Sequence, residues 1–312
     1  MKIVFFGLGS IGQRHVRILL ENYSHDLYAF RSGVNDEHNA LNITEVHSWV
    51  EVERLKPDIA FITNPTYLHI ETAIKCAKIG CKLFIEKPIG SNLENLDKLI
   101  KIVKDKNLAT YVAYCLRFHP VIKKLKEYIK KIKPVYVRAV CSSYLPNWRP
   151  GRNYLKSYSA NSSMGGGVIL DLSHELDYVC YLLGEVYKIK GSFSKRGNVT
   201  VDAEDNADTI FLSGDIPVNI HIDFLSQHKE RYVQVDFDNL TVVGDLVNVK
   251  IEEYEREVLR KSHQLVYDRG QEYVEQMKYF FDNIDNPLMM NNLGEASELF
   301  KKIVAFKNQK YE

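Results

Sequence analysis

Over the first 118 residues, short runs of apolar side chains alternate with longer stretches whose apolar residues recur at helical spacing. Short runs bounded by turn residues are typical of strands that are buried on both faces. We expect strands at 3–6, 25–30, 58–63, 82–85 and 109–115. We expect helices at 11–20, 48–57, 67–79 and 91–106. Strands that alternate with helices require crossover connections, so this half is predicted to be a doubly wound parallel α/β sheet.

Local signals set the limits of some of these helices. Ser48 with Glu51, and Ser91 with Glu94, have the S-x-x-E form of a capping box, in which the two side chains satisfy free N–H groups at a helix start. Gly80 follows the 67–79 stretch and is predicted to end that helix.

The pattern changes after Pro120, where a lysine-rich helix is predicted at 121–132. Its lysines suit a solvated helix face better than a nucleic-acid patch, because no aromatic residues interleave for stacking. Strand-like runs follow at 135–143, 186–195, 209–213, 218–225, 232–237 and 246–252. Further helices are expected at 167–183, 270–282 and 293–307. Short turns link most of the strands, so we expect a mostly antiparallel sheet and two domains, 1–118 and 119–312.

Composition narrows the class of protein. The 41 Lys and Arg residues against 40 Asp and Glu residues give a net charge of +1, which does not favour nucleic acid or an anionic membrane as the main partner. No apolar run reaches the roughly 18 residues that span a bilayer, and the N-terminus lacks the pattern of a signal peptide. The five cysteines form no C-x-x-C pair, so we expect reduced thiols in the cytoplasm and no metal site.

The segment 7–12 has the G-x-G-x-x-G form of a dinucleotide-binding loop. It follows a predicted strand and opens a predicted helix, which is the context that the motif requires. Its glycines allow a tight turn and a close backbone approach, and the helix start offers free N–H groups to a pyrophosphate. The residues expected to contact the cofactor here are Gly7, Gly9, Ser10, Ile11 and Gly12. The alternative is a purely structural turn.

The end of the second predicted strand bears on which dinucleotide binds. An acidic residue there often holds the ribose hydroxyls of NAD, but this chain has no carboxylate until Asp36. Arg31 and Ser32 instead offer a guanidinium and a hydroxyl where a 2′-phosphate would lie. We therefore expect NADP to be preferred, while stacking of Arg31 on adenine would leave NAD open.

Lys87 occupies a position at which open α/β sheets bind ligands. It follows the predicted strand 82–85 and precedes Pro88, so it lies at the carboxyl edge of the sheet. An ammonium group there can stabilise a developing alkoxide. The alternative is a surface lysine that pairs with Glu86.

The predicted helix 167–183 carries a polar face beside its apolar stripe. Asp171, His174 and Tyr178 recur at helical spacing on that face. A histidine beside a carboxylate can act as an oriented base near neutral pH, so His174 and Asp171 are candidate catalytic residues. The alternative is that His174 caps the helix or bridges to Asp177.

A long irregular segment at 144–154 offers groups that suit a sugar. Trp148 and Tyr154 present aromatic faces, and Arg149 and Arg152 present forks for a carboxylate or phosphate. The alternative is a loop that packs on a neighbouring subunit.

Four segments, taken in order, resemble motifs of the Gfo/Idh/MocA oxidoreductases. They are 7–12 (GLGSIG), 63–69 (TNPTYLH), 86–88 (EKP) and 165–174 (GGGVILDLSH). The resemblance covers essentially the whole chain. It implies a Rossmann domain followed by an α+β domain built on a large, open, mostly antiparallel sheet.

The same resemblance implies roles for individual residues. Lys87 would lie beside the nicotinamide and the reacting carbon, His174 would be the acid/base, and Arg117 would lie near the substrate. Thr63, Asn64 and Pro65 are implied to border the nicotinamide half of the cofactor. His69 and Glu86 are also expected to contact the cofactor. One position departs from the family pattern: many relatives place an aspartate four residues before the histidine, where this chain has Leu170 and then Asp171.

The resemblance further implies a nicotinamide cofactor and hydride transfer to or from a hydroxyl or keto carbon of a sugar or nucleotide sugar bound in the interdomain cleft. It implies homodimers or homotetramers built through the sheet of the second domain. Similar 144–154 loops occur in relatives associated with surface-glycan biosynthesis. A non-catalytic, dinucleotide-binding regulator of the same fold is the alternative.

Overall fold

The computed structural model describes residues 1–31, 39–149, 151 and 153–309, which divide into two compact units. Unit 1 comprises residues 1–113 and 273–300, and unit 2 comprises the described residues of 114–272 and those from 301 onward. The sequence-based division at 118/119 differs from this one mainly in residues 273–300, which pack with the N-terminal sheet.

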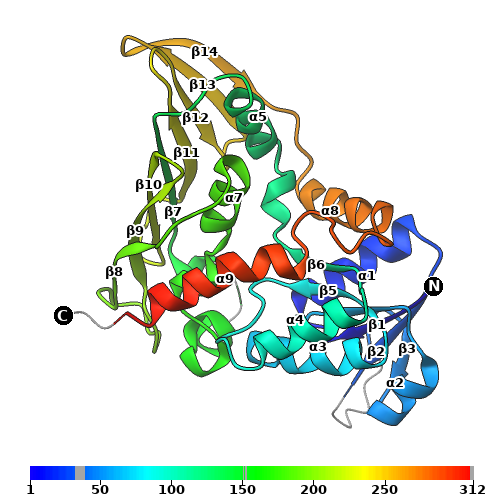
Figure 1. Ribbon diagram of the computed structural model, residues 1–312. Helices are drawn as coiled ribbons and strands as arrows, with labels where there is room; N and C mark the ends of the chain where they lie inside the picture. Colours follow the sequence, from blue (N-terminus) through cyan, green and yellow to red (C-terminus); the bar gives the residue numbers. More distant parts are fainter. Residues whose placement is uncertain (32–38, 150, 152, 310–312) are drawn as a thin grey trace. The chain divides into compact units, whose positions relative to one another are not determined.

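Unit 1 is built on a six-stranded parallel sheet in the order β3-β2-β1-β4-β5-β6 (Figure 1). The strands are β1 (Lys2–Phe6), β2 (Asp26–Phe30), β3 (Thr44–Val46), β4 (Ile59–Ile62), β5 (Lys82–Glu86) and β6 (Thr110–Ala113). The helices are α1 (Ser10–Asn22), α2 (Trp49–Leu55), α3 (His69–Lys78), α4 (Leu96–Asp105), α8 (Gln271–Asp282) and α9 (Leu293–Lys307), the last two of which cross the unit boundary. The strand order reverses between β1 and β4, which confirms the predicted doubly wound sheet and marks the edge where such sheets bind ligands.

A row of aromatic rings explains why the later helix α8 belongs to unit 1. Phe5, Phe61 and Phe84 are register partners on β1, β4 and β5, and their rings stack at 4.7 and 4.5 Å. Phe280 of α8 meets Phe61 and Phe84 edge-on and is fully buried. Without α8 this apolar row would face water, at a cost of about 25 cal/mol per Å² exposed.

Unit 2 is built on an eight-stranded sheet in the order β14-β13-β12-β11-β7-β10-β9-β8. The strands are β7 (Tyr136–Ser142), β8 (Lys190–Ser194), β9 (Asn206–Ser213), β10 (Ile216–Asp223), β11 (Glu230–Asp236), β12 (Thr241–Asp245), β13 (Lys250–Glu255) and β14 (Val258–Gln264). The pair β7 and β10 is parallel and the other neighbours are antiparallel, as predicted.

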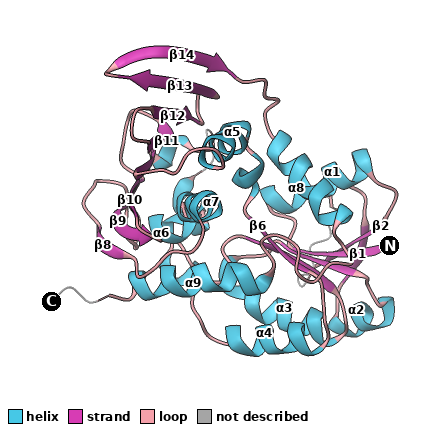
Figure 2. Ribbon diagram, turned by 45° about the horizontal axis from the view of Figure 1, so that its top comes forward, coloured by secondary structure: helices cyan, strands magenta, loops and turns pink. Residues whose placement is uncertain are grey.

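Helices cover one face of this second sheet. Figure 2 shows α5 (Pro120–Ile129), α6 (Val168–Asp171) and α7 (His174–Leu183) on the same side of it. Side chains on that face are buried, such as Ala139 of β7 and its register partners Ile220 of β10 and Val233 of β11. The opposite face of β9 exposes Ile210 and Leu212.

Two predicted helix starts have different outcomes. Ser48 caps α2 by accepting a hydrogen bond from the Glu51 N–H, so the first capping box is confirmed. The second is wrong: α4 begins only at Leu96, after Asn95 in a left-handed conformation, and the Asn92 side chain accepts the Glu94 N–H. The predicted stop at Gly80 is confirmed, because α3 ends at Lys78 and Gly80 has a φ of +90°.

The predicted helix 167–183 is two helices, α6 and α7, with a break at Leu172 and Ser173. The Ser173 hydroxyl donates to the Leu170 carbonyl oxygen, and a serine that bonds back to the chain competes with the helical pattern. The strands β3, β12 and β14 were not predicted, and the run predicted at 246–252 begins in the turn before β13. Every residue of β14 is exposed, so it shows no alternation of apolar and polar positions.

The described residues contain no helix that is long and apolar enough to cross a membrane. All five cysteines are free, and Cys180 alone among them is more than slightly exposed.

Candidate active site

The glycine loop after β1 is shaped by close backbone contacts. Gly7 has a φ of +107°, and a Cβ there would lie 2.6 Å from the Asn64 nitrogen. A Cβ on Gly12 would lie 2.2 Å from the Gly7 carbonyl oxygen, whereas one on Gly9 would meet no atom of the described structure within 4 Å. Two glycines are therefore required by the fold, and the third leaves open space where a pyrophosphate would approach.

The start of α1 fits a bound anion. Gly9 occupies the N-cap and provides no side-chain acceptor, so Ser10 and Ile11 open the helix with N–H groups directed at the loop. Thr63 supports the loop from the neighbouring strand end, because its hydroxyl donates to the Gly7 carbonyl oxygen at 2.6 Å. The loop therefore fits a dinucleotide by its shape and by its free donors.

Arg31 follows β2 at the position expected to contact the adenosine ribose. Its Nη1 lies 3.5 Å from Oε1 of Glu45, and its side chain is 24% exposed. Hydrogen bonds from Asn39 hold the pKa of Glu45 below its usual range, so this carboxylate is charged and partly neutralises the guanidinium. Ser32, predicted to act with Arg31, lies outside the described residues.

Two segments that follow β4 and β5 are joined by one histidine. His69 places Nδ1 2.8 Å from the Pro88 carbonyl oxygen and Nε2 2.8 Å from that of Asn64. The ring is buried, and burial lowers the pKa of His69 against the opposing effect of the two carbonyls. Pro65, next to Asn64, is exposed. His69 thus connects the two segments through main-chain contacts, and a direct contact with the cofactor stays a prediction.

Each carboxylate oxygen of Glu86 lies within hydrogen-bonding distance of a different residue. His15 of α1 lies 2.6 Å from Glu86 Oε1, and the Lys87 N–H donates to Oε2 at 3.2 Å. The sequence motifs do not single out His15. Its only signal is a histidine within the buried stripe of α1. The peptide between Lys87 and Pro88 is cis.

In unit 2, Asp171 and His174 lie on either side of the break between α6 and α7, so they do not share the predicted continuous helix face. The Tyr158 hydroxyl donates to Asp171 Oδ1 at 2.6 Å. The ring of Tyr114 meets His174 edge-on at 5.4 Å, and the Tyr114 hydroxyl donates to Ser173 at 3.1 Å. His174 is partly exposed, and its Nδ1 is buried.

The third residue of the predicted face has another role. Tyr178 is fully buried and donates to Glu175 Oε1 at 3.3 Å. Burial raises the pKa of Tyr178 well above its usual value, so it is a poor candidate for a base.

Arg117 is a buried partner of α7. Its Nε and Nη2 lie 2.9 and 2.8 Å from the two carboxylate oxygens of Asp177, and the residue is 4% exposed. Both carboxylate oxygens of Asp177 thus accept hydrogen bonds from Arg117, and a bridge from His174 to Asp177 stays an alternative. A direct contact of Arg117 with substrate stays a prediction, because this geometry shows a structural partner.

A second ion pair, in which only the carboxylate is fully buried, joins α7 to the sheet. Arg231 of β11 donates from Nε to Glu175 Oε1 at 2.6 Å, and Glu175 is 0% exposed. Burial, reinforced by Arg231, lowers the pKa of His119 to about 4. Neither Arg231 nor Glu175 was predicted from sequence. The available signal was Arg231 itself, a charged residue at a position of β11 that alternates in step with the buried Val233 and Val235.

The aromatic residues of the 144–154 segment are held by unit 2 itself. The Trp148 Nε1 donates to Ser143 at 2.9 Å, and its ring meets Phe224 edge-on. The Tyr154 hydroxyl accepts the Thr200 N–H at 3.2 Å. These contacts hold both rings at the surface of unit 2, and their contact with a sugar stays a prediction.

The same segment carries two arginines. Arg149 is exposed. Arg152 lies outside the described residues. Contacts of these arginines with an acidic group of the substrate stay predictions.

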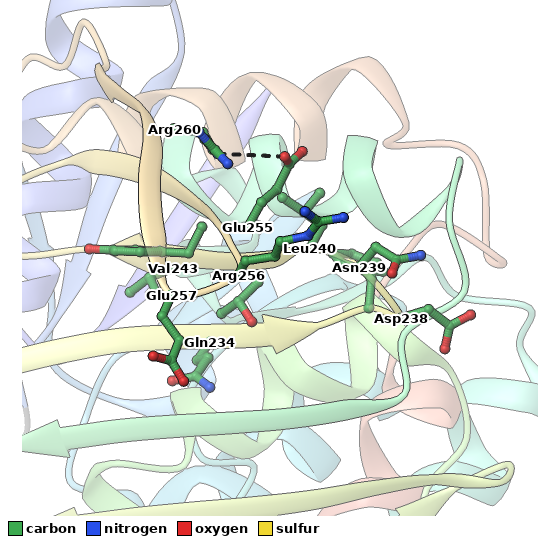
Figure 3. Close-up of a pocket in the computed structure, with 12 residues that line it drawn as sticks. Gln234, Asp238, Asn239, Leu240, Val243, Glu255, Arg256, Glu257 and Arg260 are labelled. Atoms are coloured by element: carbon green, nitrogen blue, oxygen red, sulfur yellow. Dashed lines mark ion pairs between the residues drawn. The ribbon is translucent and has the colours of Figure 1, made fainter.

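An open hollow of about 970 Å³ lies elsewhere, at the ends of the β11–β12 and β13–β14 hairpins (Figure 3). Its lining is mixed in charge, with Arg260 near Glu255, and it contains none of the predicted site residues. Among the described residues, no group of three or more His, Cys, Asp or Glu side chains could hold a metal ion.

Comparison with known proteins identifies the family that both domains of the chain resemble. Residues 1–114 match the family model described as "Oxidoreductase family, NAD-binding Rossmann fold", and residues 122–246 match the Gfo/Idh/MocA C-terminal domain. Myo-inositol 2-dehydrogenase of Thermotoga maritima is 28% identical over 216 residues, which cover 65% of this chain and 60% of that protein. Levoglucosan dehydrogenase of Pseudarthrobacter phenanthrenivorans is 26% identical over 169 residues, which cover 54% and 40%. The chain thus spans 60% or less of the length of these two relatives.

Solved structures show the same fold over nearly the whole chain. A levoglucosan dehydrogenase in complex with NADH has a TM-score of 0.85 at 16% identity and covers 98% of this chain and 95% of that one. UDP-N-acetylglucosamine 3-dehydrogenase of Acidithiobacillus ferrooxidans has a TM-score of 0.80 at 18% identity and covers 98% and 96%. Because models of both domains of one family match in order, this chain belongs to the Gfo/Idh/MocA oxidoreductase family.

Proposed function

We propose that this protein is a nicotinamide-dependent oxidoreductase that transfers hydride between its cofactor and a hydroxyl or keto carbon of a sugar or nucleotide sugar. The observation that carries the proposal is the convergence of three segments at the carboxyl edge of the parallel sheet. Thr63 holds the glycine loop, and His69 joins the Asn64 and Pro88 segments around Lys87. This edge is where open α/β sheets bind dinucleotides.

The cofactor, when bound, supplies or accepts the hydride. Lys87 hydrogen-bonds the substrate oxygen through Nζ and stabilises the negative charge that develops on it. His174 takes the hydroxyl proton at Nε2 during oxidation and returns it during reduction. The neutral side chain of Tyr114 packs edge-on against the imidazole and limits its rotation.

The cofactor is proposed to be NADP in preference to NAD. Arg31 contacts Glu45 through one long contact, so the guanidinium keeps donors for a 2′-phosphate. The relatives suggest the class of substrate. They are named for myo-inositol, levoglucosan and UDP-N-acetylglucosamine, which are all polyhydroxylated rings.

We also propose a homodimer or homotetramer in the cytoplasm. The exposed apolar side chains on the open sheet face of unit 2 support assembly, and five free cysteines suit a reducing compartment.

The experiment is an absorbance titration of the purified protein with each cofactor and a panel of cyclitols, sugars, uronic acids and nucleotide sugars. A change in the reduced-nicotinamide band that depends on one sugar class supports the proposal. The matched control is the Lys87→Met variant, which should bind cofactor and give no change. Tight cofactor binding with no change for any substrate would favour the regulator of the same fold.

A further inference from the structure

His15 is a buried polar side chain in α1 that reaches the segment carrying Lys87. Its exposed fraction is 0%, and its Nε2 lies 2.6 Å from Oε1 of Glu86. It follows Gly12 along the first half of the helix that opens at the glycine loop. The contact therefore joins the helix expected to hold the pyrophosphate to the strand end that precedes Lys87.

Aromatic neighbours fix the position of the His15 ring. Phe84 meets it edge-on at 5.1 Å, and the rings of Phe61 and Tyr273 lie at 6.1 and 6.2 Å. Interiors are close-packed, so the imidazole cannot turn away from Glu86 without opening this part of the core.

The hydrogen-bonding pattern assigns the tautomer of His15. Its Nδ1 is buried and has no hydrogen-bond partner among the described residues. A proton on Nδ1 would be a buried donor with nothing to donate to, which costs about 1–3 kcal/mol. The contact is satisfied when Nε2 carries the proton and donates it to the carboxylate of Glu86.

Both oxygens of Glu86 then have a defined task. Oε1 accepts from His15, and Oε2 accepts the main-chain N–H of Lys87. The residue is only 7% exposed, so water does not readily replace a lost donor. Two successive hydrogen bonds thus run from α1 through Glu86 to the backbone of Lys87.

We propose that His15 is a positioning residue for Lys87: by donating to Glu86, it fixes the carboxylate that holds the Lys87 main chain, and so sets where the Lys87 ammonium reaches. The inference rests on the proposed function of Lys87. It means that the helix beginning at the cofactor loop also aligns the group that stabilises the reacting oxygen.

Stability alone does not account for the pair. Replacing a buried polar pair by apolar side chains of similar volume is often neutral or stabilising, whereas removing one partner leaves the other unsatisfied. A positioning role explains why the donor and the acceptor both point along one path to Lys87.

The test uses the full-length protein with His15→Ala, His15→Gln and a matched control, Phe280→Leu. Glutamine keeps an N–H donor toward Glu86 without the ring. Phe280 is equally buried and packs on the same aromatic row, but its side chain has no group that could donate a hydrogen bond to Glu86. Three quantities are measured: kcat, the dissociation constant of the cofactor, and the exchange rate of the Lys87 amide hydrogen without substrate.

For His15→Ala we expect kcat to fall about 10- to 100-fold, as misplaced catalytic groups do, with cofactor affinity changed less than about threefold. Amide exchange at Lys87 should accelerate, and His15→Gln should restore most of both properties. Phe280→Leu should lower the melting temperature without the selective loss of kcat. Unchanged Lys87 exchange in His15→Ala would overturn the inference whatever the activity, whereas absence of turnover in the unmodified protein would count against the proposed function alone.

Discussion

The Tyr158 hydroxyl and the Asp171 carboxylate form a hydrogen bond of 2.6 Å in unit 2. Asp171 closes α6 and is 4% exposed, so this tyrosine satisfies one oxygen of a nearly buried carboxylate. Asp171 therefore has a structural task next to the break that precedes His174. Asp171 lies three residues before His174, whereas many relatives have the aspartate four residues before. Both observations indicate that Asp171 and His174 have different roles.

We predict that Asp171→Asn, which keeps an acceptor for Tyr158, lowers kcat by less than about 10-fold, a smaller loss than removal of a general base produces. Tyr158→Phe leaves the carboxylate short of a donor and should cost about 1–3 kcal/mol of unfolding free energy. Steady-state kinetics measure the loss of kcat in Asp171→Asn, and urea unfolding measures the loss of stability in Tyr158→Phe. A loss in Asp171→Asn as large as that in His174→Ala would assign the aspartate a direct catalytic part.

Removing His174 should be more damaging. His174→Ala is expected to lower kcat by about 10²–10⁴-fold, the usual contribution of a general base, with cofactor affinity nearly unchanged. Lys87→Ala should be at least as damaging. The control is His228→Ala, because His228 is exposed and only its main-chain oxygen makes a hydrogen bond in the described structure. Near-full turnover by His174→Ala on the true substrate would mean that another group is the base.

Much of the fold follows from local periodicity, because buried strands and amphipathic helices repeat their apolar residues at distinct intervals. The limits of this approach are visible at two elements. β14 is exposed on both faces and carries no alternation. The break between α6 and α7 depends on Ser173, whose hydroxyl also accepts from Tyr114, a residue far away in the sequence.

Some residues of the candidate site could be predicted from local sequence, and others could not. The glycine loop and the segments around Asn64 and Lys87 were predictable, because a short motif carries its own chemistry. His15 and Glu86 lie 71 positions apart, and Arg117 and Asp177 lie 60 apart. Pairs of this kind depend on which strands and helices become neighbours, which no local pattern encodes.

Cofactor choice gives a third prediction. Arg31→Asp should weaken NADPH binding by about 1–3 kcal/mol, the range for a charge-assisted hydrogen bond, and should affect NADH less. Glu45→Gln is the informative companion, because it releases Arg31 from its carboxylate and should tighten NADPH. Fluorescence titration of both cofactors measures the differences. Tighter binding of NADH than NADPH by the unmodified protein would contradict the preference.

Stability should depend on pH through His221 on the open face of the second sheet. Its Nε2 lies 3.1 Å from Asp223 and its Nδ1 2.9 Å from Asp208, and these hydrogen bonds raise the pKa of His221 from 6.5 to about 9. A raised pKa in the folded state contributes stability that is full below pH 6.5 and is lost as pH rises through about 9.

The measurement compares urea unfolding of the unmodified protein and His221→Gln. Near pH 7 the unmodified protein should be more stable by about 1 kcal/mol, a modest value because the ring is partly exposed and solvent screens the pair. Near pH 10 the two curves should converge, since the imidazole is then neutral. A difference that stays constant across this range would mean that the charge of His221 does not contribute.

Assembly through the open sheet face is the last prediction. Ile210 and Leu212 alternate with buried residues along β9 and are 54% and 47% exposed, on the face opposite α6 and α7. Exposed apolar side chains on one face favour association, because association removes them from water. A closed homo-oligomer buries the same surface on each copy. We expect a dimer or tetramer by light scattering at micromolar concentration, and dissociation when Ile210 and Leu212 are both changed to Lys. Leu288→Lys is the control, because Leu288 is 84% exposed in unit 1 and lies outside this face. A monomeric unmodified protein would refute assembly, whereas an oligomer that survives the double change would place the interface on another surface.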